Sequence, residues 1–449
     1  MRGLCLMICL VAAPVMAADW PGFGGNPARD HHTNEALASK LHLAWSRQAR
    51  HRPQPAWPRD SRISYDRVSR VAVAAGRVFY GSSVDGRIRC LDAATGQTRW
   101  TFATGGPVRF APAVWRDRLF VTSDDGFLYC LDTSDGRLRA RWRGGPRDQR
   151  VMGNGQIVSR WPARGGVVIA DDIVYWAAGI WQSEGIFLRA QRAETGKVVW
   201  VNSTSGGIEM AQPHGGATAK SGVTAQGHLV VAGKRLLVPT GRAVPAVFDR
   251  STGKFLFYRL QQNTHRGATA TLSFGRLFIN GGLAYDLETG GLLKGLGGGS
   301  VAAAGETLWR GTGTTLERWA VVERPGKDRK GKPVTIRELQ KKSAVADVPA
   351  GQGVLVAGKT VVSAGPDRVA VVNTTAGGVA WQHEVEGTPY DLAVSDGRLF
   401  VSTDAGRLYC FSATAIKKPV HFRPSRPDAG SIKPAIVAAA SSILKTSSV

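Results

Sequence analysis

The feature that most constrains the fold is a unit that the sequence writes twice in succession. Residues 76–100 read GRVFYGSSVDGRIRCLDAATGQTRW, and residues 117–142 read DRLFVTSDDGFLYCLDTSDGRLRARW. Each copy alternates apolar runs with Gly-containing turns and ends in a segment that carries Trp, which predicts an antiparallel meander. One meander cannot bury its own apolar faces. A tandem array with a period of roughly 40 residues can, and this pattern is typical of β-propeller blades.

The same register continues along the chain and predicts eight units. The turn before the second strand of each unit falls at Gly76, Asp117, Asp171, Gly233, Gly275, Gly305, Gly358 and Gly397. The last unit stops near Ser412 without a Trp strand, whereas residues 41–47 (LHLAWSR) form an unassigned strand around Trp45. We therefore predict an all-β, eight-bladed propeller of four-stranded antiparallel blades in which the N-terminal strand completes the last blade and removes free sheet edges. Seven blades is the alternative, because the sixth unit is degenerate.

These repeats resemble those of the quinoprotein-type propellers. That superfamily includes pyrroloquinoline quinone-dependent dehydrogenases, an outer-membrane-assembly propeller lipoprotein and many exported bacterial proteins. The resemblance covers residues 20–412, and residues 19–30 (DWPGFGGNPARD) resemble the lead-in of the exported, uncharacterised branch. The resemblance implies the fold, and it does not choose between an enzyme and a binding protein.

The chain ends predict export and one propeller domain. Residues 1–17 combine a basic residue, an apolar run at 4–13 and Ala17 before the expected cleavage site, which is typical of a secretory signal peptide. We therefore expect a periplasmic or secreted protein whose propeller spans residues 18–413. No other stretch is long and apolar enough to suggest a membrane span. Residues 414–449 carry a basic and then an Ala/Ser-rich segment without blade pattern, and we expect them to be disordered.

The charge predicts an anionic partner. Lys and Arg total 58 against 34 Asp and Glu, a formal net charge of +24. We expect a monomer that meets a protein, a polyanion, a small anion or an anionic surface, and not nucleic acid, because no nucleic-acid-binding motif is present. Residues 323–342 in the sixth unit hold eight basic and three acidic residues, which predicts a flexible, solvated insertion. Cys90, Cys130 and Cys410 occupy one slot in three units, which predicts buried strand residues without a disulfide.

The candidate binding residues lie in the loops that lead into the inner strands, which we call the inner-strand loops. Propeller topology places them on one face around the central channel, and the long ones are residues 48–70, 144–166 and 202–227. Several end in a basic residue. We predict that these side chains converge at the channel mouth and bind an anion through charge-assisted hydrogen bonds, the alternative being scattered, solvated arginines. The candidates are Arg70, Arg109, Arg164, His214, Arg242 and Arg266.

The third unit adds a long hairpin at residues 176–190 on the same face. Two tryptophans there are candidates for stacking a flat ring, the alternative being that they pack the loops together. They are Trp161 and Trp181. Oxygen ligands for calcium can be named in these loops, but their spacing does not make them a set, so we predict no metal site. They are Glu184, Glu209 and Asn154.

Catalytic members of the resembled superfamily stack the quinone between a Trp and a disulfide of adjacent cysteines, with calcium held by Glu and Asn and an Asp base. This chain has no adjacent cysteines, no haem-attachment motif and no zinc, serine-nucleophile or phosphate-loop motif. The pair Asp124-Asp125 lies in a repeat turn, where we expect it to cap the backbone. We therefore predict an exported, non-catalytic propeller that binds its ligand through the channel face. The alternative is a divergent alcohol or sugar dehydrogenase that uses pyrroloquinoline quinone with calcium.

Overall fold

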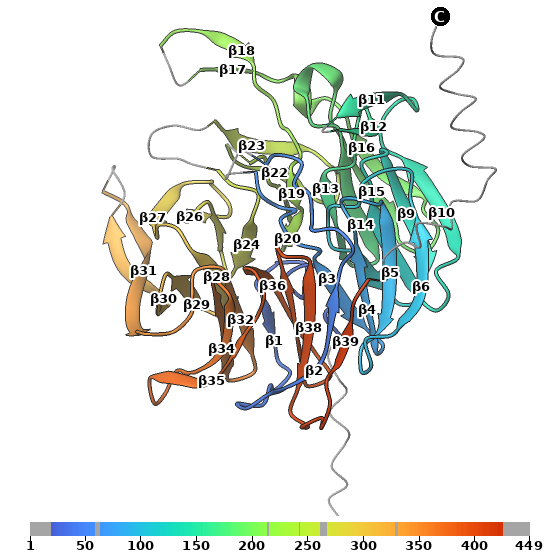
Figure 1. The fold of residues 1–449 in the computed structure, drawn as a ribbon. Helices are drawn as coiled ribbons and strands as arrows, with labels where there is room; N and C mark the ends of the chain where they lie inside the picture. The colour runs from blue at the N-terminus through green and yellow to red at the C-terminus, as the bar shows by residue number, and fades with distance from the viewer. Residues whose placement is uncertain are drawn as a thin grey trace, which may run out of the picture.

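Eight four-stranded sheets stand in a ring around a central channel in the computed structural model, so the chain is an eight-bladed β-propeller (Figure 1). The structure describes residues 19–58, 63–153, 155–212, 215–241, 243–260, 267–327 and 331–424. The predicted blade number is confirmed, and the predicted signal peptide at residues 1–17 lies outside the described residues. Among the residues that the structure describes, no helix has the length and apolar character needed to cross a membrane.

The strands of the first four blades run from the channel outward in chain order. Blade 1 is β3 (Val71–Ala74), β4 (Arg77–Gly81), β5 (Arg87–Asp92) and β6 (Thr98–Ala103); blade 2 is β7 (Ala113–Trp115), β8 (Arg118–Thr122), β9 (Phe127–Asp132) and β10 (Leu138–Arg143); blade 3 is β13 (Gly165–Ala170), β14 (Ile173–Ala178), β15 (Phe187–Arg192) and β16 (Val198–Asn202); and blade 4 is β20 (Val230–Ala232), β21 (Arg235–Val238), β22 (Val244–Asp249) and β23 (Phe255–Arg259).

The last four blades follow the same order, except that an N-terminal strand completes blade 8. Blade 5 is β24 (Thr271–Phe274), β25 (Leu277–Asn280), β26 (Leu283–Asp286) and β27 (Leu292–Gly295); blade 6 is β28 (Ser300–Ala304), β29 (Thr307–Thr312), β30 (Thr315–Lys327) and β31 (Pro333–Val345); blade 7 is β32 (Gly353–Ala357), β33 (Thr360–Gly365), β34 (Arg368–Asn373) and β35 (Gly378–Glu384); and blade 8 is β36 (Pro389–Ser395), β37 (Arg398–Thr403), β38 (Arg407–Ser412) and β2 (His42–Gln48).

Short strands and hairpins decorate this frame. Three short strands add in parallel to blade edges: β19 (Gly227–His228) beside β13, β1 (His32–Thr33) beside β32, and β39 (Val420–Phe422) beside β2. The inner-strand loops of blades 3 and 4 fold into the hairpins β11 (Arg150–Gly153) with β12 (Gln156–Ser159) and β17 (Glu209–Ala211) with β18 (Thr218–Lys220). The 3-10 turns η1 (Gln182–Glu184) and η2 (Ser205–Gly207) also lie in loops of this part of the chain. The segment after residue 413 contains a strand, and the part of the expected disordered tail beyond residue 424 lies outside the described residues.

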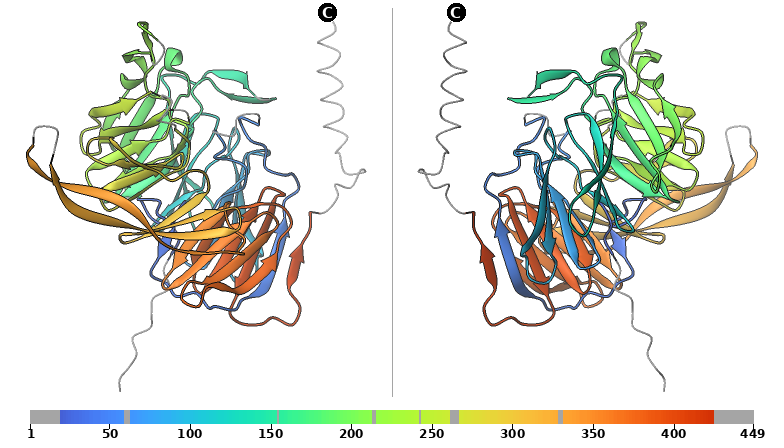
Figure 2. Two further views of the ribbon diagram at one scale, coloured as in Figure 1. Left: turned by 90° about the vertical axis from the view of Figure 1, so that its left-hand side faces the viewer. Right: turned by 90° about the vertical axis from the view of Figure 1, so that its right-hand side faces the viewer.

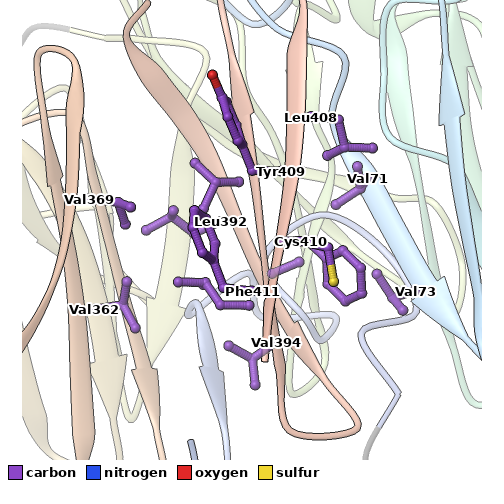
Figure 3. Packing of buried hydrophobic residues seen from close by; sticks show 14 of the residues in the cluster. Val71, Val73, Val362, Val369, Leu392, Val394, Leu408, Tyr409, Cys410 and Phe411 are labelled. Atoms are coloured by element: carbon purple, nitrogen blue, oxygen red, sulfur yellow. The ribbon is translucent and has the colours of Figure 1, made fainter. Parts of the chain in front are cut away.

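The predicted closure of the ring is confirmed. β2 pairs antiparallel with β38, and Trp45 lies opposite Cys410. Alternate residues of β38 face the two neighbouring blades, and Figure 3 shows Cys410 and Phe411 on opposite sides of the strand. Cys410 Sγ points to the carbonyl of Ala93 in blade 1, whereas the Phe411 ring packs on Trp381 of blade 7. The three cysteines are buried and unbridged, as predicted for strand residues.

A Gly and a Trp of the repeat hold neighbouring blades together at several junctions. The Trp45 ring covers Gly96 of blade 1, and the Trp100 ring covers Gly136 of blade 2. Each indole N–H also donates to a carbonyl of the next blade, at 3.0 Å for both Trp45 to Ala93 and Trp100 to Thr133. Because Gly96 and Gly136 have φ of +73° and +75° and lie against the rings, a side chain at either position would collide with the indole.

The described residues of the basic segment 323–342 are not a flexible insertion. Residues 323–327 and 333–342 form the outer part of β30 and β31, two paired 13-residue strands that we call the ribbon (Figure 2). Cross-strand ion pairs fix its register, with Arg324 beside Glu338 at 2.7 Å and Arg337 beside Glu323 at 2.6 Å. The prediction was wrong because the charges that suggested solvation alternate along two strands and pair across them.

The lead-in segment, residues 20–35, contacts every blade. Main-chain hydrogen bonds join it to the inner strands of six blades, through Trp20, Pro21, Pro27, Ala28, Asp30 and His31. Arg29 reaches the carbonyl of Val167 in blade 3, and the Glu35 carboxylate accepts from the Gly397 N–H in blade 8. The segment therefore joins the blades around the channel and supplies side chains to its interior.

Candidate functional site

Two of the predicted arginines meet in the channel, and carboxylates of the chain neutralise both. Arg109 and Arg164 share Asp124: Arg109 Nε lies 2.6 Å from Oδ2, and Arg164 Nη2 lies 2.8 Å from the same atom. Arg109 Nη1 also lies 2.6 Å from Asp66 Oδ2. Their side chains are at most 4% exposed. This cluster is a closed set of two cations and two anions, so its carboxylates occupy the positions that an external anion would take.

Asp124 bonds to both arginines of this cluster. The sequence predicted a backbone cap at this position, and that prediction was wrong. Burial raises the pKa of a carboxyl, but the guanidinium groups of Arg164 and Arg109 lower the pKa of Asp124 below its ordinary value. Burial prevails at Asp66, whose pKa is raised. The neighbouring Asp125 does act as a cap, because its carboxylate accepts from the Phe127 and Gly105 N–H groups at 3.1 and 2.8 Å.

A cavity of about 520 Å³ lies in the channel beside blades 5 to 8. Glycine-rich loop segments at 281–282, 298–299 and 351–353 line it, together with residues of the 64–70 loop and Tyr390. Phe23 and His31 of the lead-in line it from within the channel. This volume is within the range of roughly 300–1,000 Å³ that small-molecule sites occupy.

Arg70 and Arg67 place positive charge on this cavity. Arg70 Nη1 lies 3.2 Å from Asp391 Oδ1, and its guanidinium stands 4.5 Å from the centre of the Phe23 ring. Arg67 donates to the Tyr390 hydroxyl at 3.3 Å, and no described carboxylate lies within ion-pair distance of it. Burial raises the pKa of Asp391 to about 6 although Arg70 opposes this. The lining therefore holds two cations beside one carboxyl that protonates readily.

Two hydroxyl groups at the cavity have no hydrogen-bond partner in the described part of the chain. They are Tyr65 Oη and Ser300 Oγ, and both residues line the cavity. Burial raises the pKa of Tyr65, so this group stays a neutral donor. Unsatisfied buried hydroxyls are costly, and a polar ligand in the cavity would satisfy them.

The two histidines at the cavity are neutral. Burial, followed by the charges of Arg70 and Arg29, lowers the pKa of His31 to about 3 and lowers that of His228 well below its ordinary value. His228 stacks on Phe23 with ring centres 4.0 Å apart, and its Nε2 accepts from the Ala111 N–H at 3.2 Å. These rings give the cavity a flat, uncharged surface.

The two candidate stacking residues differ in role. Trp161 is 4% exposed, donates to the carbonyl of Glu184 at 2.5 Å and packs on Phe187, so it joins loops together. Trp181 is 54% exposed and meets the edge of Trp57, with ring centres 5.9 Å apart. Neither lines the cavity.

The weak calcium candidates do not come together. Glu184 pairs with Arg160, and Glu209 is exposed on β17. Within the described ranges, no group of three or more His, Cys, Asp or Glu side chains could hold a metal ion. The remaining candidates, His214, Arg242, Arg266 and Asn154, lie outside the described residues.

The cavity lining does not match the quinone and calcium site of the catalytic propellers. The three described cysteines are buried in separate blades, so none can form the disulfide platform. Asp391 is held by Arg70 and by the Val71 N–H at 2.9 Å, which leaves no carboxylate set for calcium among the described lining residues. No catalytic step through this cofactor follows from these residues.

Several residues of the channel were not among the predicted binding residues. They include Asp66, Asp124, Arg67, Tyr65 and Asp391. Residues 64–70 end an inner-strand loop, which is the signal that brought Arg70 into the candidate set. Arg67 lies three residues before Arg70 in the same loop, so the same signal could have made it a candidate. Asp391 lies near the start of β36, and its pairing with Arg70 joins positions 321 residues apart, which no local pattern shows.

Comparisons with known proteins agree with this architecture. A europium-containing methanol dehydrogenase is similar over 88% of this chain and 98% of its own, with a TM-score of 0.59 and 12% identity. Quinohemoprotein alcohol dehydrogenase from Comamonas testosteroni is similar over 91% of this chain and 82% of its own, with a TM-score of 0.59 and 13% identity. The computationally designed Ika8 protein matches with a TM-score of 0.53 and 16% identity, over 78% of this chain and 96% of its own. At these identities the likeness shows the fold alone.

No curated protein sequence matches the chain. A sequence profile described as outer membrane protein assembly factor BamB matches residues 43–206 and 299–443, more than half of the chain. The chain therefore belongs to the quinoprotein-like β-propeller repeat family that this profile describes.

Proposed function

We propose that this chain is an exported, non-catalytic propeller that binds a small anionic ligand in the channel cavity. The observation that carries the proposal is the cavity lining with Arg67 and Arg70, where Arg67 has no described carboxylate partner. Arg70 keeps its single described carboxylate partner, Asp391, at 3.2 Å. A ligand carboxylate, sulfate or phosphate would form charge-assisted hydrogen bonds with both guanidinium groups.

The rest of the lining supports a ligand with an uncharged polar or flat body. Tyr65 Oη and Ser300 Oγ lie on different parts of the lining and offer unused hydrogen-bonding capacity. Phe23 offers an aromatic surface beside Arg70. The Arg109 and Arg164 cluster acts as a neutral support, because Asp66 and Asp124 already balance it.

The test is titration calorimetry of the purified protein with sulfate, glucuronate and benzoate. We expect at least one to bind, and Arg67→Gln to weaken that binding about 10- to 100-fold, because a hydrogen bond to a charged group contributes about 1.5–3 kcal/mol. Arg52→Gln is the matched control, because Arg52 is an exposed arginine of the same loop. Equal loss in both variants, or unchanged affinity in Arg67→Gln, would contradict the proposal.

The second candidate is a divergent dehydrogenase that uses pyrroloquinoline quinone, and the observation that favours it is the fold shared with two dehydrogenases. The lining described above does not fit the known arrangement of that cofactor. The two functions separate when the protein is mixed with the quinone and calcium. A bound chromophore together with dye reduction by alcohols or sugars would favour the dehydrogenase, and no binding at micromolar quinone would exclude it.

A further inference from the structure

The ribbon extends beyond the blade that carries it. β29 pairs with β30 only as far as Ala320, whereas β30 and β31 stay paired out to Lys327 and Pro333. Figure 2 shows this part projecting away from the ring, on the side opposite to β11 and β12. Beyond Ala320 the ribbon has only two strands and no pairing with β29. A two-stranded ribbon is only marginally stable by itself in water.

The base of the ribbon is firmly anchored. Leu339 is 2% exposed in a core cluster shared with blade 5, and Trp319 and Val321 pack against the same cluster. Glu317 accepts from Arg310 at 2.7 Å and from Lys341 at 2.8 Å. These contacts fix the direction in which the outer half projects.

The outer edge of β31 is open. β31 is the last strand of blade 6, and no described strand pairs with its free side along its 13 residues. Blade 8 presents the corresponding edge on β2, and there β39 adds in parallel opposite Trp45, Ser46 and Arg47. This propeller thus already accepts an extended segment at the outer edge of one blade.

The ribbon has a surplus of positive charge. Its two strands hold six basic and three acidic residues, and all three glutamates are already paired within blade 6. Three basic side chains of the two strands have no described carboxylate partner. They are Arg318, Lys327 and Lys342.

The charge pattern of the ribbon also indicates which kind of partner fits its open edge. Arg324 lies opposite Ile336, and Glu338 lies opposite Val322, so apolar and charged side chains share one face and no continuous apolar face is available for a bilayer. A second copy of the same edge would bring like charges together. An acidic, extended segment would balance the charge and use the open main-chain groups.

We propose that the outer edge of β31 is a strand-addition site for an extended, acidic segment of a partner protein. Main-chain hydrogen bonds to β31 would provide affinity, and Arg318, Lys327 and Lys342, which have no described carboxylate partner, would select acidic side chains. This site is separate from the channel cavity and does not depend on the small-anion proposal.

The test measures fluorescence anisotropy of three labelled peptides with the full chain. One alternates Val and Glu, the second alternates Val and Gln, and the third is the Glu peptide with every second backbone nitrogen methylated. We expect the Glu peptide to bind and the other two to bind at least about tenfold more weakly, because one lacks charge and the other cannot form a strand ladder. Equal binding of the methylated and unmethylated Glu peptides would overturn strand addition in favour of charge attraction alone.

Two variants locate the site. Lys327→Gln with Lys342→Gln should weaken binding of the Glu peptide at least about fivefold, whereas Lys417→Gln with Lys418→Gln, an exposed lysine pair before β39, should not. Replacing residues 323–337 by Asn-Gly should abolish binding while the melting temperature and sulfate binding stay near those of the full chain. No binding of the Glu peptide, unchanged binding in the shortened chain, or binding only to phosphatidylglycerol vesicles would each overturn the proposal.

Discussion

Three arginines near the channel have different kinds of partner. They are Arg29, Arg109 and Arg67. Arg29 is 3% exposed and donates to three carbonyls, those of Phe23, Val167 and Leu229, and burial lowers its pKa to about 9. Arg109 is neutralised by two carboxylates. Arg67 has a phenol and no described carboxylate as its partner, so it has the greatest capacity for a ligand.

The pair of Arg70 and Asp391 predicts that anion binding depends on pH. Burial raises the pKa of Asp391 to about 6, so its carboxylate competes with a ligand for Arg70 above that pH and is protonated below it. His31 and His228 stay neutral in this range, because their pKa values are lowered. Sulfate affinity should therefore rise severalfold between about pH 7.5 and about pH 5, as measured by calorimetry.

Asp391→Asn provides the control for this pH dependence. An amide carries no charge at either pH, so the variant should bind sulfate with one affinity throughout, close to that of the unmodified protein at the acidic end of the range. A pH profile unchanged by this substitution would show that another group titrates.

At this scale the sequence pointed to Arg109 and Arg164 as candidates but not to the carboxylates that pair with them. Arg109 and Arg164 end inner-strand loops, a position that topology alone places near the channel. Asp66 comes from a different loop, 43 residues before Arg109, and Asp124 follows the local pattern of a turn cap. Which carboxylate meets which guanidinium depends on how the blades pack, and this information is not local.

Elements that repeat were predictable, because each blade satisfies the same local requirements. Eight turns with residues at positive φ precede the second strands, and Trp and Gly recur because each joins two neighbouring blades. The ribbon was mispredicted because it departs from the repeat in length. Its stability depends on cross-strand pairs such as Glu323 with Arg337, which become visible only when the register is known.

The closing strand predicts a large stability effect at Trp45. Its ring is 1% exposed, covers Gly96 and lies 6.2 Å from the Phe400 ring. Trp45→Ala should lower the free energy of unfolding by about 3–5 kcal/mol, because it removes a buried aromatic ring at the junction of the first and last blades. Chemical denaturation followed by fluorescence measures this change. Trp381→Ala, at a half-buried ring of blade 7, should cost clearly less, and equal costs would contradict a special role for the closure.

At the scale of the whole molecule, the lead-in segment links the blades to the site. Residues 20–35 touch all eight blades and so give them one common partner. The same segment contributes Phe23 and His31 to the cavity. Cooperative stability of the ring and the shape of the ligand site therefore depend on one stretch of chain.

Deleting residues 19–35 while keeping β2 tests this link. The ring should still close, because β2 pairs with β38 without help from the deleted residues, so the strand signal in circular dichroism should remain. The melting temperature should fall, because main-chain bonds to six inner strands and the three bonds of Arg29 are lost. Sulfate affinity should fall with it although Arg67 and Arg70 are intact, because the cavity loses the Phe23 and His31 side of its lining.

The shortened-ribbon chain is the matched control for this deletion, because it removes a similar length without touching the channel. It should keep both the melting temperature and the sulfate affinity. If the lead-in deletion instead melts and binds like the full chain, the segment is an accessory strap, and the cavity must be formed by the blades and their inner-strand loops alone. If stability falls while sulfate affinity is unchanged, Arg67 and Arg70 are sufficient for binding, and the aromatic side of the cavity serves the ring and not the ligand.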